Sequence, residues 1–126
     1  TGQALEFDGV TDYISFDAIT LDGDFTFATW MKIDAFSGYL PFIGTTANGN
    51  NLIGLKDSNA SNLYIRFSTS GGSQVSVDAV LNIGQWHRVV FVRDKSASEL
   101  YYYVDGVLIK SMTGIDVPLV ANDLVL

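Results

Sequence analysis

The chain has 126 residues, of which 48% are hydrophobic and 17% charged, a composition typical of one globular domain rather than a disordered segment. Fourteen acidic residues against seven basic ones give a net charge of −7, and no basic patch is visible, so a nucleic-acid partner is disfavoured. There is no cysteine, which excludes thiol catalysis and thiolate-bound metals, and no apolar run approaches the roughly 20 residues of a membrane-inserted helix.

Short β-prone segments separated by Gly, Asn and Asp fill the first two thirds of the chain. In Phe25–Ile33 the apolar residues alternate, which places them on one face and leaves Trp30 out of phase with them. Pro41 cannot donate a ladder hydrogen bond, so we expect an edge strand or a bend there. The sequence predicts strands over Ala4–Phe7, Tyr13–Phe16, Phe25–Ile33, Tyr39–Ile43, Leu52–Lys56, Leu63–Phe67 and Gln74–Val80.

The last third contains the most specific local signal, Asp105-Gly106 between two β-prone runs. Asp-Gly favours a two-residue hairpin turn because Gly accepts positive φ freely and Asp tolerates it. In the run Tyr101-Tyr102-Tyr103, alternation must send the middle ring to the face opposite its neighbours. The strands predicted here are Gln85–Asp94, Glu99–Val104, Val107–Lys110, Val117–Val120 and Leu124–Leu126.

No window carries a helical apolar stripe longer than a turn or two. The sequence therefore predicts an all-β fold, an antiparallel two-sheet β-sandwich with jelly-roll or Greek-key connections, forming one domain over residues 1–126. Because a strand that stops in mid-pattern leaves backbone groups unpaired, we expect that residues 1–126 are an excerpt of a longer chain or pair with another chain.

Four segments, in this order, resemble the laminin G-like, concanavalin A-like jelly roll and its pentraxin branch. They are Ala4–Ile14, Gly23–Trp30, Gly84–Val89 and Tyr103–Val107. The resemblance implies the same fold, with the last pair of strands missing. It leaves function open, because this architecture carries lectins, adhesion modules, glycosidases and structural domains.

Catalysis is disfavoured. Glycosidases on this scaffold resemble one another in placing two or three carboxylates on alternate residues of one strand. The nearest arrangements are Glu6 with Asp8 and Asp22 with Asp24, both at turns and both without a third member. His87, the only histidine, has no nucleophile-elbow serine to accompany it, and we interpret it as a packing and hydrogen-bonding residue.

Calcium is the one cofactor that the sequence leaves open, because it needs six to eight oxygen ligands gathered from loops. The resemblance to pentraxins maps half of a calcium site onto Asn50-Asn51, where two amides replace an acidic-amide pair and remove charge. Asp8 and Asp12 form a separate candidate cluster. For all of them a solvated turn is the competing interpretation.

Aromatic residues make up 13% of the chain, which suits sugar binding because exposed rings stack on sugars. The candidate ligand-contacting residues are Trp30, Tyr39, Tyr64, Arg66 and Tyr102. Burial of these rings under loops is the alternative, since strands favour Tyr on half-buried faces.

We therefore expect a non-catalytic recognition or adhesion module that binds a glycan or a glycosylated surface. It would belong to a larger extracellular, cell-surface or virion protein. The alternative is a structural or assembly domain, such as a decoration or fibre module, that packs against neighbouring protein subunits.

Overall fold

The computed structural model describes residues 2–8, 11–35, 39–44, 52–57, 63–68, 74–114 and 119–125. These residues form ten β-strands, and none of them belongs to a helix that could cross a membrane. The strands are β1 (Tyr13–Leu21), β2 (Phe25–Lys32), β3 (Tyr39–Gly44), β4 (Leu52–Asp57), β5 (Leu63–Ser68), β6 (Gln74–Asp78), β7 (Trp86–Asp94), β8 (Glu99–Val104), β9 (Val107–Thr113) and β10 (Leu119–Val125).

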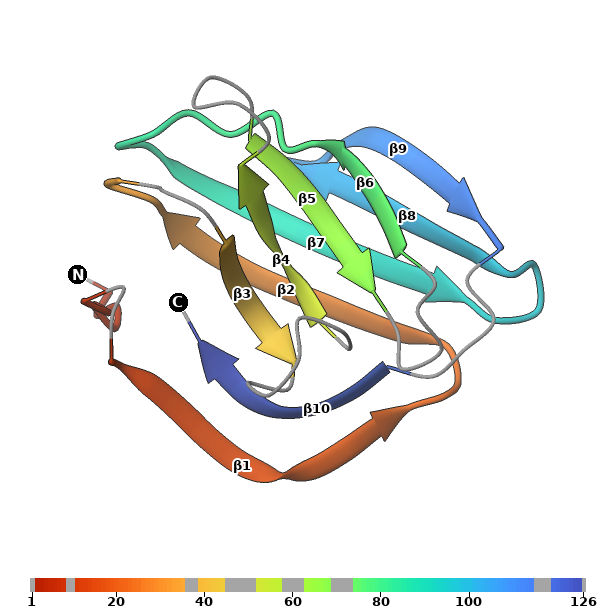
Figure 1. Ribbon diagram of the computed structural model, residues 1–126. Helices are drawn as coiled ribbons and strands as arrows, with labels where there is room; N and C mark the ends of the chain where they lie inside the picture. The colour runs from red at the N-terminus through yellow and green to blue at the C-terminus, as the bar shows by residue number, and fades with distance from the viewer. Residues whose placement is uncertain are drawn as a thin grey trace.

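The strands form two antiparallel sheets that lie in separate layers (Figure 1). A six-stranded sheet has the order β1-β10-β3-β4-β5-β6, and a four-stranded sheet has the order β2-β7-β8-β9. The chain passes from one sheet to the other four times, between β1 and β2, β2 and β3, β6 and β7, and β9 and β10. The predicted all-β sandwich of jelly-roll type is confirmed.

The core lies between the layers and is densest around β7 and β8. Every second residue of β7, from His87 to Arg93, is buried, as is every second residue of β8. The ring of Phe91 stacks on that of Tyr102 with centroids 5.0 Å apart. On the six-stranded side Ile43 and Ile53 complete the same core cluster. In β2, Phe25, Phe27 and Met31 face this core, as the alternation predicted.

The hairpin between β8 and β9 forms as the sequence predicts. Asp105 and Gly106 occupy the turn with φ of 51° and 84°, the left-handed conformation that a two-residue turn needs. Immediately before the turn, alternation sends Tyr102 into the core and leaves its two neighbours half-buried on the opposite face.

One local prediction is wrong. Ala4–Phe7 is not a strand, because no described strand lies beside it to accept its hydrogen bonds, and Leu5 is largely exposed. Of the two alternatives for Pro41, an edge strand or a bend, the structure has the irregularity: β3 runs between β10 and β4, and the β3–β4 register shifts between Pro41 and Ile43. The pairs between β10 and β3 are at Ile43 and Gly44, beyond Pro41.

Candidate functional site

The four-stranded sheet has one face against the core and one face turned outward. We call the second face the outer face and define it by the residues of β2, β7 and β8 that alternate with the core residues. They are Thr26, Ala28, Trp30, Lys32, Trp86, Arg88, Val90, Val92, Asp94, Glu99, Tyr101 and Tyr103. Seven of these twelve residues are apolar or aromatic, which is unusual for a sheet surface that meets solvent, and the two acidic ones, Asp94 and Glu99, are paired at one end.

Both tryptophans of the chain lie on the outer face. Trp30 is 62% exposed and Trp86 is 53% exposed. In the β2–β7 ladder Trp30 pairs with Arg88, and Lys32 pairs with Trp86. The two tryptophans are therefore diagonal neighbours, a relation that places residues about 7–8 Å apart. The arrangement offers two flat apolar rings beside a guanidinium group.

A shallow hollow of about 240 Å³ continues this surface toward the β8–β9 turn. Its lining residues are Arg88, Val90, Val92, Tyr103 and Gly106. Val90 and Tyr103 are cross-strand partners, so an apolar side chain and a phenol form the floor together. Among the described residues Arg88 has no ion-pair partner, which leaves its five N–H donors available to a ligand.

A hydrogen-bonded group fixes the strand end that carries Trp86 and Arg88. The Asp105 carboxylate accepts the backbone N–H of Arg88 at 2.8 Å and lies 2.8 Å from Nδ1 of the buried His87. On the other side of that ring, Nε2 accepts the backbone N–H of Asn82 at 3.1 Å, so Nδ1 carries the proton that Asp105 receives. The Arg88 N–H and then the His87 ring lower the pKa of Asp105. His87 therefore has the structural role that the sequence indicates.

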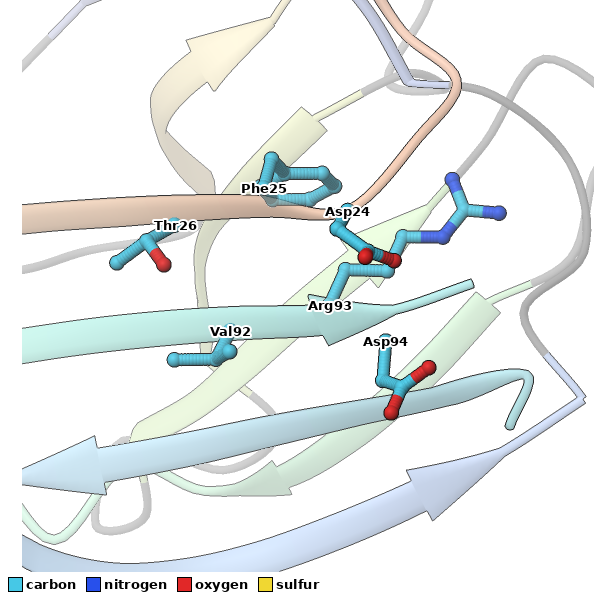
Figure 2. A pocket seen from close by; sticks show the side chains of 6 residues that line it. All are labelled: Asp24, Phe25, Thr26, Val92, Arg93 and Asp94. Atoms are coloured by element: carbon cyan, nitrogen blue, oxygen red, sulfur yellow. The ribbon is translucent and has the colours of Figure 1, made fainter. Parts of the chain in front are cut away.

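A larger hollow of about 450 Å³ lies at the opposite end of β2 and β7 (Figure 2). Figure 2 shows Arg93 and Asp94 pointing to different sides of the strand. The polar groups of this hollow have structural roles. Arg93 is buried and donates from Nη1 to the Leu21 carbonyl at 3.3 Å, while Asp94 accepts hydrogen bonds from the following turn. Asp24 accepts the Lys95 N–H at 2.8 Å. Arg93, Asp94 and Asp24 are thus each hydrogen-bonded to other groups of the chain, and they hold the loops at this end of the sandwich.

The candidate calcium residues Asp8 and Asp12 hold their own turn together. Oδ1 of Asp8 accepts the backbone N–H groups of Thr11 and Asp12, at 2.8 and 3.1 Å, and its Oδ2 accepts the Thr11 hydroxyl. In return, Asp12 Oδ2 accepts the N–H of Asp8 at 3.0 Å. Among the described residues no group of three or more acidic or histidine side chains converges on a point.

The second acidic pair, Asp22 and Asp24, ties two loops together. Asp22 forms an ion pair with the Lys95 ammonium at 3.2 Å, and Asp24 accepts the backbone N–H of the same residue. The contacts of Asp22 and Asp24 with Lys95 agree with the interpretation that this pair stabilises turns.

The structure separates the predicted ligand-contacting residues. Trp30 lies on the outer face of the four-stranded sheet. Tyr39, Tyr64 and Arg66 belong to β3 and β5 of the six-stranded sheet, where the ladders bring Tyr39 and Tyr64 to opposite sides of one β4 residue, Lys56. These two sets therefore belong to different sheets. Asn50 and Asn51, the predicted calcium ligands, lie outside the described residues.

The prediction that Tyr102 contacts a ligand is wrong. Its side chain is fully buried, stacks on Phe91, and donates from its hydroxyl to the Ala79 carbonyl at 2.5 Å. Burial raises the pKa of this phenol well above its usual value. Alternation is as predicted, but the rings that leave the core are those of Tyr101 and Tyr103, so Tyr102 cannot meet a ligand at the surface.

Sequence reasoning missed Trp86, Arg88 and Tyr103 as surface residues. Their signal is present: residues 86, 88, 90 and 92 share one face of a strand, and residues 101 and 103 share one face of the next strand along the chain. The sequence did not show that this face is exposed, because Val89–Val92 is apolar on both faces and resembles a strand that is covered on both sides.

Comparison with known proteins agrees with this architecture. A laminin G family model described as the concanavalin A-like lectin/glucanases superfamily matches residues 8–126. No curated protein matches the sequence in a direct comparison.

Three solved structures share the fold. A heptameric SAP-like pentraxin from Limulus polyphemus has a TM-score of 0.60 and 16% identity, with 84% of this chain and 51% of that chain covered. The CBM40 of a Ruminococcus gnavus IT-sialidase, bound to α2,3 sialyllactose, has a TM-score of 0.59 and 15% identity, with 91% and 77% covered. Mouse laminin α1 domains LG4-5 have a TM-score of 0.55 and 18% identity, with 96% and 36% covered. The chain thus spans about half the length of the pentraxin.

Proposed function

This chain belongs to the concanavalin A-like lectin/glucanases superfamily, and we propose that it is a non-catalytic module that binds glycans on its outer face. The observation that carries the proposal is the exposure of both tryptophans on that face, diagonal to each other, with Arg88 opposite one of them. Large exposed aromatic surfaces are uncommon on a protein that has no partner.

The chemistry of the outer face matches that of a sugar ring. A pyranose has an apolar C–H face that packs on an aromatic ring, and hydroxyl groups around its rim that need donors and acceptors. Trp30 and Trp86 offer the rings, and the Arg88 guanidinium and the Tyr103 hydroxyl, at the adjacent hollow, offer polar contacts. A rigid strand backbone holds all four, so binding orders little of the protein.

The CBM40 neighbour supports a glycan ligand, since that protein was solved with sialyllactose bound. It also supplies a ligand pair for the experiment, because sialyllactose and lactose differ by one anionic sugar. We place the module outside the cell, as part of a larger cell-surface, extracellular or virion protein. The binding experiment is done with and without calcium, because the carboxylates of Asp8 and Asp12 already accept hydrogen bonds within their own turn.

The test is a glycan array followed by calorimetric titration of the best ligands, each in calcium and in chelator. Replacing Trp30 or Trp86 by Ala should weaken binding at least tenfold, equivalent to about 1.4 kcal/mol, because a stacking surface is lost. Tyr13→Ala is the matched control: Tyr13 is 61% exposed, nearly as much as Trp30, but lies on β1 of the other sheet. It should bind as the parent chain does.

Two outcomes would contradict the proposal. One is the absence of binding to any glycan in both calcium and chelator. The other is binding that survives both tryptophan substitutions but is lost in Tyr13→Ala.

An assembly domain remains the second candidate function. The observation that favours it is the set of exposed apolar side chains on β1, among them Tyr13 and Ile19, which suit contact with another polypeptide. Analytical ultracentrifugation of the chain over a range of concentrations would distinguish this function from glycan binding, because an assembly domain should self-associate and Tyr13→Ala or Ile19→Ala should weaken that association.

A further inference from the structure

The side chains around the smaller hollow of the outer face offer many hydrogen-bond donors and almost no acceptors. The lining residues, Arg88, Val90, Val92, Tyr103 and Gly106, include no Asp, Glu, Asn or Gln. The guanidinium has five N–H donors and no acceptor, and the phenol can donate its proton. A neutral sugar hydroxyl needs an acceptor as well as a donor, whereas an ionised carboxylate only accepts. The hollow therefore suits an acidic group better than a hydroxyl group.

The Arg88 side chain is exposed, and its charge is not compensated by any of the described residues. Lys32, the other cation of the outer face, forms an ion pair with Asp34 at 3.0 Å. Asp105 lies in the turn beside the hollow, but both of its carboxylate oxygens are engaged. Its Oδ1 accepts the Arg88 backbone N–H, and its Oδ2 lies 2.8 Å from Nδ1 of His87. The Arg88 guanidinium is thus available to an acidic ligand.

The strand ladders place Arg88 between the tryptophan rings and the hollow. Arg88 lies opposite Trp30 in the β2–β7 ladder and two residues from Trp86 along β7, on the same face. In the other direction along β7, Val90 is two residues from Arg88 and pairs with Tyr103. Residues two apart along a strand are separated by about 7 Å. One guanidinium can therefore contact a group in the hollow while a neighbouring sugar stacks on a tryptophan.

The opposite end of the outer face is acidic. Asp94 and Glu99 are partners in the β7–β8 ladder, and Asp94 lies roughly 20 Å along β7 from Arg88. The whole chain carries a net charge of −7. A ligand with acidic groups along its entire length would meet repulsion from this end and from the protein as a whole. The charge pattern therefore favours a ligand whose acidic group is confined to one place.

We infer that the glycan bound on the outer face contains one acidic sugar, whose carboxylate or sulfate binds the Arg88 guanidinium at the hollow while neighbouring neutral sugars stack on Trp30 and Trp86. The inference rests on the proposed function and adds a ligand class to it. A guanidinium fork forms two parallel hydrogen bonds with a carboxylate, and bonds to ionised groups are about twice as strong as neutral ones. A sulfate ester presents similar acceptor oxygens. Since the guanidinium supplies the positive charge, this contact needs no metal ion.

The experiment compares related glycans with and without an acidic group. Lactose, 3′-sulfated lactose and α2,3-sialyllactose form one series, and cellobiose with cellobiouronic acid forms a second. Heparin fragments represent ligands that are acidic along their length. In calorimetric titrations with chelator present, the best glycan with one acidic group should bind at least tenfold more tightly than its neutral counterpart and than heparin. Raising the salt concentration should reduce this advantage. The sulfated and sialylated arms show which acidic group is preferred.

A substitution of Arg88 tests the contact itself. Arg88→Gln removes the charge but keeps the backbone N–H that Asp105 accepts. In this variant the acidic and the neutral member of a series should bind with equal affinity. Lys110→Gln, at an exposed position of β9 in the same sheet, changes the net charge by the same amount and is the matched control. It should keep the advantage of the acidic glycan.

Failure of this inference is distinguishable from failure of glycan binding. Equal affinities of the parent chain for acidic and neutral glycans would overturn the inference and leave glycan binding in place. The same holds for heparin binding as tightly as a glycan with one acidic group, and for an acidic advantage that Arg88→Gln retains or that chelator removes. The absence of binding to every glycan would overturn the proposed function, and this inference with it.

Discussion

The Asp105 carboxylate illustrates how single residues hold this site. It is partly exposed, yet it accepts the Arg88 backbone N–H and contacts the buried His87 ring, which in turn accepts the Asn82 N–H. One side chain in the β8–β9 turn thus links two other segments of the chain. Trp86 and Arg88, the neighbours of His87 in sequence, point outward because His87 is held inward.

This linkage predicts a pH dependence of stability. Hydrogen bonds from Arg88 and His87 lower the pKa of Asp105 in the folded state below its value of about 3.9 in an unfolded chain. The stabilisation by the ionised carboxylate is therefore complete above that value and is lost as the pH falls through the folded-state pKa. The difference in unfolding free energy between the parent chain and Asp105→Asn should be largest near pH 7 and should shrink below about pH 4.

Urea unfolding at pH 7, 4 and 3 measures this difference. Asn is a suitable replacement because it tolerates the positive φ of position 105. An equal difference at pH 7 and pH 3 would show that the charge of Asp105 is not involved.

At the scale of elements, two hairpins that share β8 fix its register. The β7–β8 turn, residues 95–98, leads into a ladder in which Val90 pairs with Tyr103, and the β8–β9 turn pairs Val104 with Val107. A slip of one residue would exchange the faces and expose the ring of Tyr102 while burying its neighbours. The turns at the two ends of β8 thus determine which side chains lie on the outer face.

A pair of glycine substitutions tests the turn. Gly106→Ala should cost about 1 kcal/mol, because Gly106 has φ of 84°, a conformation that costs an L-residue roughly 1–2 kcal/mol. Gly23→Ala, in the β1–β2 turn, is the control and should be nearly neutral, since Gly23 is not in that conformation. No atom lies within 4 Å of the added methyl group in either case, so steric clash does not contribute. Equal costs by denaturant unfolding would contradict this account.

Most of the strands and the β8–β9 turn could be predicted from the sequence, but the order of the strands in the two sheets could not. Period-two patterns and Asp105-Gly106 are local signals, and the structure confirms what they predict. Which sheet receives a strand depends on pairings distant in sequence. Trp30 and Tyr64 are both predicted strand aromatics, yet they belong to different sheets. The prediction that Tyr102 is exposed was wrong for a related reason. Alternation shows that Tyr102 and its two neighbours lie on opposite faces of the strand, but it does not show which of these faces packs against the other sheet.

At the scale of the whole molecule, burial is uneven across the sandwich. The core is complete at β7 and β8, where Phe91 and Leu100 are fully buried, and incomplete toward β1 and β2. The stability of residues 1–126 therefore depends mainly on the half of the sandwich in which both layers are present.

Two phenylalanine substitutions should measure this unevenness. Phe91→Ala should destabilise the chain by about 3–5 kcal/mol, the cost of a cavity in a packed core. Phe16→Ala, in exposed β1, should cost less than about 1 kcal/mol because few contacts are lost. Chemical denaturation of both variants gives the two values. Similar costs would mean that β1 is packed as tightly as β7.

The residues of the outer face alternate with core residues along the same strands. Substitutions that change the surface and substitutions that change the core therefore fall at different positions of one strand. If the outer face binds glycans as proposed, substitutions at Trp30, Trp86 or Arg88 would alter the ligand that this face binds, while the neighbouring positions of the same strands keep the fold. Related chains with this backbone could then acquire different ligand preferences by point mutation alone, without insertions in their loops. Among otherwise similar sequences, different residues at these three positions would then indicate a change in ligand specificity.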